Sequence, residues 1–186
     1  MNLARQVKLG GLANDADGPD LGFLLLPRDT LGDLQSKSVF FNMTKGKENA
    51  LEMAEKADLH AVAGVVAEWT IDLTTERPDT LLKQMRTLFG AGRIVSEQES
   101  GRFDLKDFKV DLPSTVDPPR SYGGVSGGGL WRVKFADESR STVVRRVLVG
   151  VAFYELPRGD GDMIIRCHGP RSLYNTLVPK IQDVCA

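Results

Sequence analysis

The sequence has few thiol or imidazole groups to bind a metal or form a disulfide bond. It contains only two cysteines and two histidines among 186 residues. Cys167 and Cys185 lie near the end of the chain, and with His60 and His168 they form no spacing typical of a metal site. We therefore expect no metal and no cofactor. For the two thiols, the reduced state fits this pattern better than a disulfide between them.

The chain also lacks an excess of charge of either sign and any long apolar run. Its 24 basic and 25 acidic residues give a formal net charge of −1, so we expect no surface of the kind that binds nucleic acid or an anionic membrane. No uninterrupted apolar stretch is long enough to span a bilayer, and the first residues lack the apolar core of a secretory signal. The sequence thus predicts a cytoplasmic protein that binds neither nucleic acid nor a membrane.

Short apolar segments with strand-like composition are abundant. Hydrophobic residues make up 41% of the chain, which is typical of a globular protein. Segments rich in Val, Ile and aromatic residues, several of them alternating with polar residues, predict a mainly β fold of the barrel or sandwich type. The expected strands are 6–12, 21–27, 36–43, 60–73 with a bend at Gly64, 93–100, 102–113, 130–135, 143–156 and 163–168.

Three segments predict helices instead. In 78–92, five apolar residues from Leu81 to Phe89 follow the spacing of one helical face, and Gly90 stands where a C-terminal cap is expected. A short helix is expected within 44–59. A terminal helix is expected in 172–184, with Ser172 as its N-terminal cap.

The segment "SYGGVSGGGLWRV", residues 121–133, places Ser126 among five glycines and then turns into an apolar strand pattern. A phosphate-binding loop of the Walker type needs a lysine at its end and a following helix, and a dinucleotide loop needs a different glycine spacing. Neither requirement is met. A flexible linker is disfavoured because a patterned strand follows directly, which leaves a turn that presents a nucleophile.

Residues Gly124 to Gly128 also satisfy the G-x-S-x-G pattern of α/β-hydrolases, in which the serine lies on a strand-to-helix elbow. Asp160 or Asp162 and then His168 follow in the order Ser, Asp, His. A small esterase with Ser126 as nucleophile is therefore one alternative. It requires a helix directly after Gly128, where three consecutive glycines and a strand pattern disfavour one.

The segment "GGVSGGGLW" resembles the nucleophile segment of the trypsin-like serine peptidases, G-[DN]-S-G-G-P-[LV]. Two further segments resemble this family in the same order along the chain: "GPDLGFLLLP" before it and "VLVGVAFYE" after it. The resemblance implies a double β-barrel with a cleft between the barrels. It also implies Ser126 as nucleophile, Asp20 as triad acid, an oxyanion hole formed by the amides of Gly124 and Ser126, and a substrate pocket that includes Arg120 and Glu155.

The sequence departs from this family where the triad histidine is needed. None of the 19 residues before Asp20 is a histidine, and we expect His60 and His168 to be structural residues. Phe153 and Glu155 are bulkier than the residues the family has at the matching positions. Without a general base, the hydroxyl group of Ser126 is a poor nucleophile.

We therefore predict a single trypsin-like unit over 1–186, with 1–60 as the remnant of an incomplete first barrel and 61–186 as the second barrel and C-terminal helix. The predicted role is binding of a protein or peptide without catalysis. The alternative is an active serine endopeptidase whose histidine comes from an upstream segment or a partner. An incomplete barrel leaves strand edges unpaired, so we expect a second copy or a partner chain to cover them.

Overall fold

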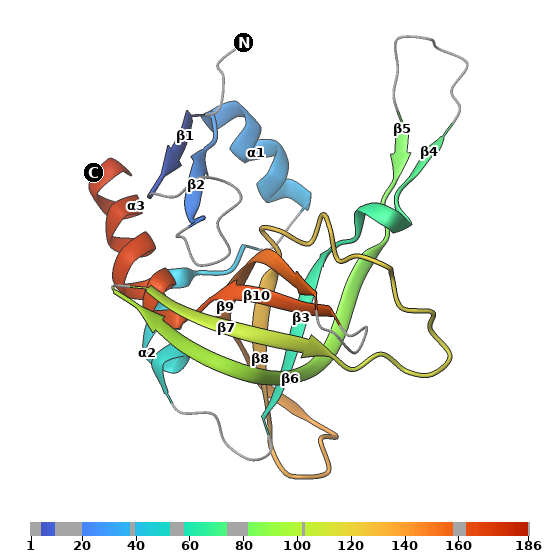
Figure 1. Cartoon of the computed structure of the whole chain (residues 1–186). Helices are drawn as coiled ribbons and strands as arrows, with labels where there is room; N and C mark the ends of the chain where they lie inside the picture. The colour runs from blue at the N-terminus through green and yellow to red at the C-terminus, as the bar shows by residue number, and fades with distance from the viewer. Residues whose placement is uncertain are drawn as a thin grey trace.

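A closed barrel of six antiparallel strands forms the centre of the computed structural model, which describes residues 5–9, 20–37, 40–52, 58–73, 82–101, 103–157 and 163–185 (Figure 1). Around the barrel, β3 pairs with β6, β6 with β7, β7 with β10, β10 with β9, β9 with β8, and β8 with β3 again. The prediction of a mainly β protein with a barrel is confirmed. The strands are β3 (Leu59–Val65), β6 (Thr87–Ser100), β7 (Phe103–Val110), β8 (Gly129–Phe135), β9 (Val143–Pro157) and β10 (Met163–His168).

The remaining described elements lie outside the barrel. Two small antiparallel sheets are present, β1 (Arg5–Lys8) with β2 (Gly22–Leu25), and β4 (Ile71–Leu73) with β5 (Leu82–Gln84). In Figure 1 the β4–β5 hairpin projects away from the barrel. The helical elements are α1 (Arg28–Lys37), α2 (Met43–Leu51), a 3-10 turn (Ala67–Trp69), a π-helical turn (Ser172–Leu177) and α3 (Val178–Cys185).

The barrel interior is filled by apolar side chains that alternate along the strands with outward-facing ones. This pattern is plainest in β9, where Val147 and Val149 are buried and Leu148 between them is only partly so. The largest fully buried apolar side chains of the barrel strands are Val62, Phe108, Leu130, Val147 and Ile165. The strands predicted on either side of Gly101 and at 130–135, 143–156 and 163–168 are confirmed.

The helix predicted for 78–92 is wrong within the described residues, which begin at Leu82. β5 and the start of β6 occupy this segment, and burial alternates along it: Leu88 is 3% exposed, Phe89 is 72% exposed, and Gly90 is buried. Pairing of β6 with β3 and β7 outweighs the local helical spacing, and Gly90 and Gly92 weaken any helix there.

The strand predicted for 36–43 is also wrong. α1, which the sequence did not predict, extends to Lys37, residues 40–42 form no strand, and α2 begins at Met43. The side chain of Asn42 accepts a hydrogen bond from the Lys45 amide at 3.0 Å, so it caps α2. Residues 38–39 lie outside the described residues. The short helix expected within 44–59 is confirmed as α2.

The segment 60–73 is not one bent strand. β3 ends at Val65, the 3-10 turn follows, and β4 belongs to a separate sheet.

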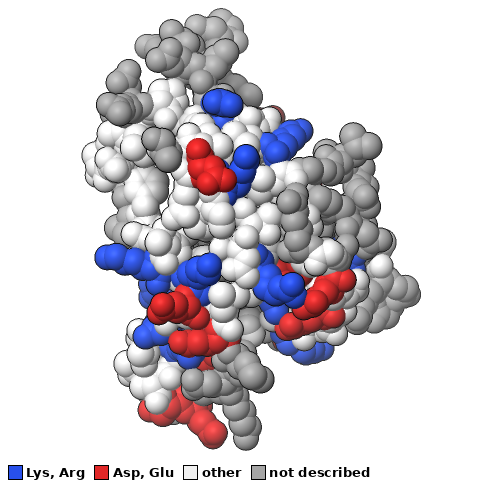
Figure 2. All heavy atoms as spheres, turned by 90° about the vertical axis from the view of Figure 1, so that its left-hand side faces the viewer, with Lys and Arg blue, Asp and Glu red and all other residues white. Residues whose placement is uncertain are grey.

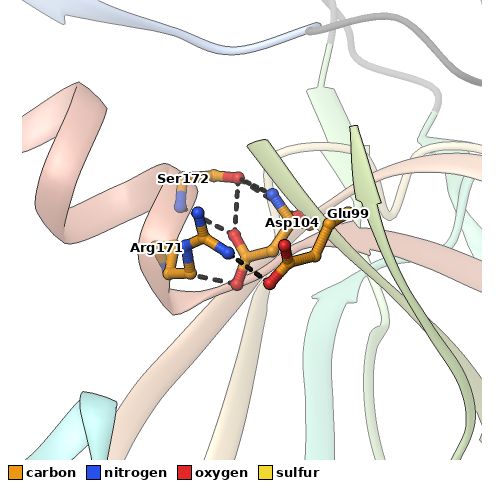
Figure 3. A network of polar contacts seen from close by, with 4 residues as sticks. All are labelled: Glu99, Asp104, Arg171 and Ser172. Carbon is orange, nitrogen blue, oxygen red and sulfur yellow. Dashed lines mark hydrogen bonds and ion pairs between the residues drawn. The ribbon is translucent and has the colours of Figure 1, made fainter. Parts of the chain in front are cut away.

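The π-helical turn and α3 together form the C-terminal helical segment. The carboxylate of Asp104 in β7 holds the start of this segment to the barrel (Figure 3). This carboxylate accepts hydrogen bonds from the amides of Arg171 and Ser172 at 3.1 and 2.7 Å, at the first turn of the helix. The Ser172 hydroxyl group donates a hydrogen bond to the same carboxylate at 2.7 Å, and Arg171 pairs with Glu99. The terminal helix is confirmed, but Asp104 rather than Ser172 caps it.

The close approach of β6 to β7 at Gly92 yields a prediction. A Cβ atom at Gly92 would lie 2.0 Å from the main-chain oxygen of Lys109, so Gly92→Ala should lower the free energy of unfolding by about 2–3 kcal/mol. Gly32 in α1 has no atom within 4 Å of such a Cβ, so the control Gly32→Ala should be neutral or stabilising by up to about 1 kcal/mol. Equilibrium urea unfolding measures both, and equal effects would contradict the β6–β7 packing.

Candidate functional site

The segment around Ser126 forms a tight turn that leads directly into β8. Gly124 and Gly127 have φ angles of +91° and +84°, in a region that side chains with a Cβ rarely adopt. Ser126 lies between them and is exposed. The glycines therefore allow the chain to present the Ser126 hydroxyl group at the surface.

The turn is fixed to the barrel on both sides of the serine. The side chain of Val125 is 2% exposed and lies against Gly64 of β3, where an added Cβ would come within 2.9 Å of it. The Gly127 amide donates to the Ala152 oxygen at 2.8 Å, and the Ala152 amide donates to the Gly128 oxygen at 2.8 Å. Ser126 is thus held in place by buried packing beneath it and by main-chain bonds to β9.

The resemblance assigns two main-chain amides, those of Gly124 and Ser126, to an oxyanion hole, and neither amide donates a hydrogen bond to another described residue. Neighbouring amides in the turn are bonded, including Val125 to the Tyr122 oxygen at 3.0 Å. Among the described residues, the amides of Gly124 and Ser126 have no hydrogen-bond partner. They are available as donors to the carbonyl oxygen of a ligand.

Asp20 and Ser126 line the same groove, although they lie 106 positions apart in the sequence. The groove has a volume of about 300 Å³ and lies between the start of β2, the Ser126 turn and β9. Phe23 and Phe153 form apolar parts of its wall. The structure therefore brings together the acid and the nucleophile that the sequence singled out.

His168 is buried beneath this groove and does not line it. Its side chain is 0% exposed and stacks on Phe153 with ring centroids 4.3 Å apart. Within the described part of the chain, neither ring nitrogen makes a hydrogen bond. Phe153 lines the groove that contains Ser126, so the aromatic ring rather than the imidazole is presented to the serine.

Burial lowers the pKa of the His168 imidazole, and the negative charges of Asp104 and Asp20 partly oppose this shift. The main chain of Asp20 opposes it as well, although the contact falls short of hydrogen-bond geometry. The imidazole is therefore held neutral in the folded protein at pH 7.

His60 lies in β3 and lines a different pocket, which shares no described residue with the Ser126 groove. Burial is the main cause that lowers its pKa, with contributions from Arg132 and Lys106. Of the described residues that line the Ser126 groove, none is a histidine.

Glu155 has a structural role in the turn. Its carboxylate accepts hydrogen bonds from the Ser121 hydroxyl and the Tyr122 amide, both at 2.7 Å. A small depression of about 70 Å³ is lined by Gly124, Ser126 and Glu155. Glu155, which the resemblance assigns to the substrate pocket, therefore lies beside the two residues assigned to the oxyanion hole, but the space is too small for a large side chain.

Arg120 lies outside this depression. It lines a neighbouring pocket of about 430 Å³ formed largely by the proline-rich segment 112–119. The carboxylate of Glu68 holds the main chain here by accepting from the amides of Arg120 and Ser121 at 2.8 and 3.3 Å. Glu68 does not stand out in the sequence, since nothing in the local pattern around it indicates a contact 52 residues away.

Other functional classes can be tested directly on the described residues. The strand β8 follows Gly128, where the elbow of an α/β-hydrolase requires a helix, so that alternative is excluded. Asp160 and Asp162, its acid candidates, lie outside the described residues. Both cysteines are free, as expected.

The described residues contain no group of three His, Cys, Asp or Glu side chains that could hold a metal ion. None of the helices in the described ranges is long and apolar enough to cross a membrane.

No family model matches the chain, and no curated protein or solved structure matches it either. The resemblance to trypsin-like peptidases therefore rests on the three sequence segments and stays a prediction.

The lowered pKa of His168 predicts that acid destabilises the fold. Because the folded-state pKa lies below the ordinary value of 6.5, the unfolded chain binds the proton more readily. This contribution to stability is complete above pH 6.5 and is lost as the pH falls below it. His168→Leu should therefore flatten the decrease in the free energy of unfolding between pH 7 and 5.5, measured by urea unfolding.

His60→Gln serves as the comparison, since the pKa of His60 is also lowered and its loss should flatten the profile in the same direction. A His168→Leu profile as steep as that of the unsubstituted protein would show that His168 is not held neutral.

Proposed function

We propose that the groove beside Ser126 binds an extended segment of a protein or peptide without cleaving it. The observation that carries this proposal is an exposed serine whose own amide, like that of Gly124, has no hydrogen-bond partner among the described residues, in a groove whose described lining has no histidine. Donor groups for a peptide carbonyl are present, whereas the base that would activate the serine is not.

Acyl transfer by Ser126 would require removal of its hydroxyl proton as the oxygen attacks a carbonyl carbon. Asp20 lines the groove but would normally orient a histidine rather than take this proton itself. The only histidine near Asp20 in the described chain, His168, is covered by Phe153. A bound peptide carbonyl would thus accept hydrogen bonds from Gly124 and Ser126 and remain uncleaved.

We further propose that the barrel is related to one barrel of the trypsin-like peptidases. Three features support this: the barrel is closed and antiparallel, the Ser126 turn leads into the β8–β9 hairpin, and a helix follows the last strand. A double barrel and an incomplete first barrel are part of the same proposal.

An active serine endopeptidase is the second candidate, with its histidine supplied by another segment or a partner chain. The placement of Asp20 and Ser126 on one groove favours it, because this is the pair between which such a histidine would act. A partner or second copy could also cover the apolar side chains of β2 and its flank, where Leu24 is 61% and Leu26 41% exposed.

Labelling with a fluorophosphonate probe separates the two candidates. The binding proposal predicts that the intact mass of the purified chain is unchanged after incubation with the probe, because an unactivated serine reacts too slowly. Labelling of the chain that disappears in Ser126→Ala would contradict it and would support the peptidase.

Trypsin incubated in parallel is the positive control for the probe. Ser139→Ala is the matched variant, since Ser139 is likewise exposed but lies in the β8–β9 turn. Labelling that persists equally in Ser126→Ala and Ser139→Ala would be nonspecific. It would not come from Ser126, so the binding proposal would stand.

A further inference from the structure

A second pocket, separate from the Ser126 groove, opens on the side of the barrel beneath α2. It has a volume of about 590 Å³, which is within the usual range for small-molecule sites. Aliphatic side chains form much of its wall, including Leu51, Ile94, Leu105 and Val149. It shares no described lining residue with the Ser126 groove.

The floor of this pocket holds a buried guanidinium group, that of Arg132 in β8, whose side chain is 4% exposed. Its two terminal nitrogens donate to main-chain oxygens at the end of α2, those of Glu52 at 2.6 Å and of Asn49. Its Nε makes no hydrogen bond, although it forms an ion pair at 3.7 Å with an oxygen of the buried Asp58 carboxylate. A buried donor left without a hydrogen bond destabilises the fold unless a ligand or water satisfies it.

Most other charged side chains around the pocket are paired, and the carboxylate of Asp104 accepts hydrogen bonds from the amides of Arg171 and Ser172. Lys106 pairs with Glu97 at 2.8 Å, and Arg171 pairs with Glu99. Figure 2 shows the corresponding mixture on the face that carries α2 and α3, where acidic and basic side chains lie beside one another. The positive charges of Arg132 and Lys106 act on His60 inside the pocket and contribute to lowering its pKa.

From these observations we propose that this pocket binds an aliphatic carboxylate. The carboxylate would accept a hydrogen bond from Arg132 Nε, which supplies the missing partner, and the hydrocarbon part would lie against Leu51, Ile94 and Leu105. A phosphate-like dianion fits less well, since the surrounding ion pairs leave one unsatisfied donor rather than a cluster of free cations.

Two sources share this chemistry: a free fatty acid and the C-terminal residue of a peptide that ends in an aliphatic side chain. Isothermal titration calorimetry of the full chain with sodium octanoate and with 1-octanol measures the contribution of the carboxylate. We expect octanoate to bind about tenfold or more tightly than octanol, as for a charge-assisted hydrogen bond to a buried donor. Equal affinity for the two would overturn the proposal.

Acetyl-Gly-Gly-Leu, with its C-terminal amide as the control, distinguishes the sources. If the free-acid peptide binds more tightly than octanoate, the site takes a chain terminus, and if it binds more weakly, the site takes a fatty acid. Both results support the carboxylate site, and equal binding of octanoate and octanol would overturn it whichever peptide binds.

Two variants test whether octanoate binds in this pocket. Arg132→Lys retains the charge but removes Nε, and it should weaken octanoate binding about tenfold. Because Arg132 also holds α2, Arg132→Lys could lose binding by unfolding, so a second variant leaves Arg132 in place. Leu51→Trp, at a position that is 42% exposed, should block the pocket and abolish octanoate binding.

Ile71→Trp, at a position of β4 that is 47% exposed, is the matched control and should bind octanoate normally. Equal octanoate affinity in Leu51→Trp and Ile71→Trp would exclude this pocket as the site.

Discussion

The position of Ser126 depends on the contact between Val125 and Gly64. Val125 is almost fully buried, and the strand β3 can approach it only because residue 64 has no side chain. The approach is equally tight at Gly128, where an added Cβ would lie 2.4 Å from the Ala63 oxygen. Closure of the barrel, which places β3 beside β8, therefore also fixes the turn that precedes β8.

Several properties of the candidate site follow from this packing. Because Val125 points into the barrel core, its neighbour Ser126 is presented outward, and the two flanking glycines adopt positive φ angles. The amides of Gly124 and Ser126 are then left without partners among the described residues. Phe153 completes the groove on the β9 side and separates it from His168. The result is a turn that presents an exposed serine beside two hydrogen-bond donors, in a groove whose described lining residues include no histidine.

The sequence predicts the barrel strands well where apolar residues alternate, as in 130–135 and 143–156, because burial of one face follows directly from that period. It fails in 78–92, where the helical spacing of five apolar residues conflicts with the pairing of β6 between two neighbouring strands. Such pairing depends on residues far away in the chain, so a local pattern does not contain it. Gly64 in 60–73 is predicted to mark a bend in the strand. It instead marks a close contact with Val125.

For the site, Ser126, Gly124 and Asp20 could be singled out from the sequence because each lies in a recognisable segment, and the structure places Asp20 and Ser126 on one groove. The contacts made by Glu155 and Glu68 with the turn could not be predicted, since both join residues at least 33 positions apart.

The most direct test of the account is the distance from Ser126 Oγ to the nearest imidazole nitrogen in a crystal structure of the chain. We expect no imidazole nitrogen within about 3.2 Å of this oxygen, the reach of a general base. A histidine nitrogen hydrogen-bonded to Ser126 would contradict the account and indicate an assembled catalytic site.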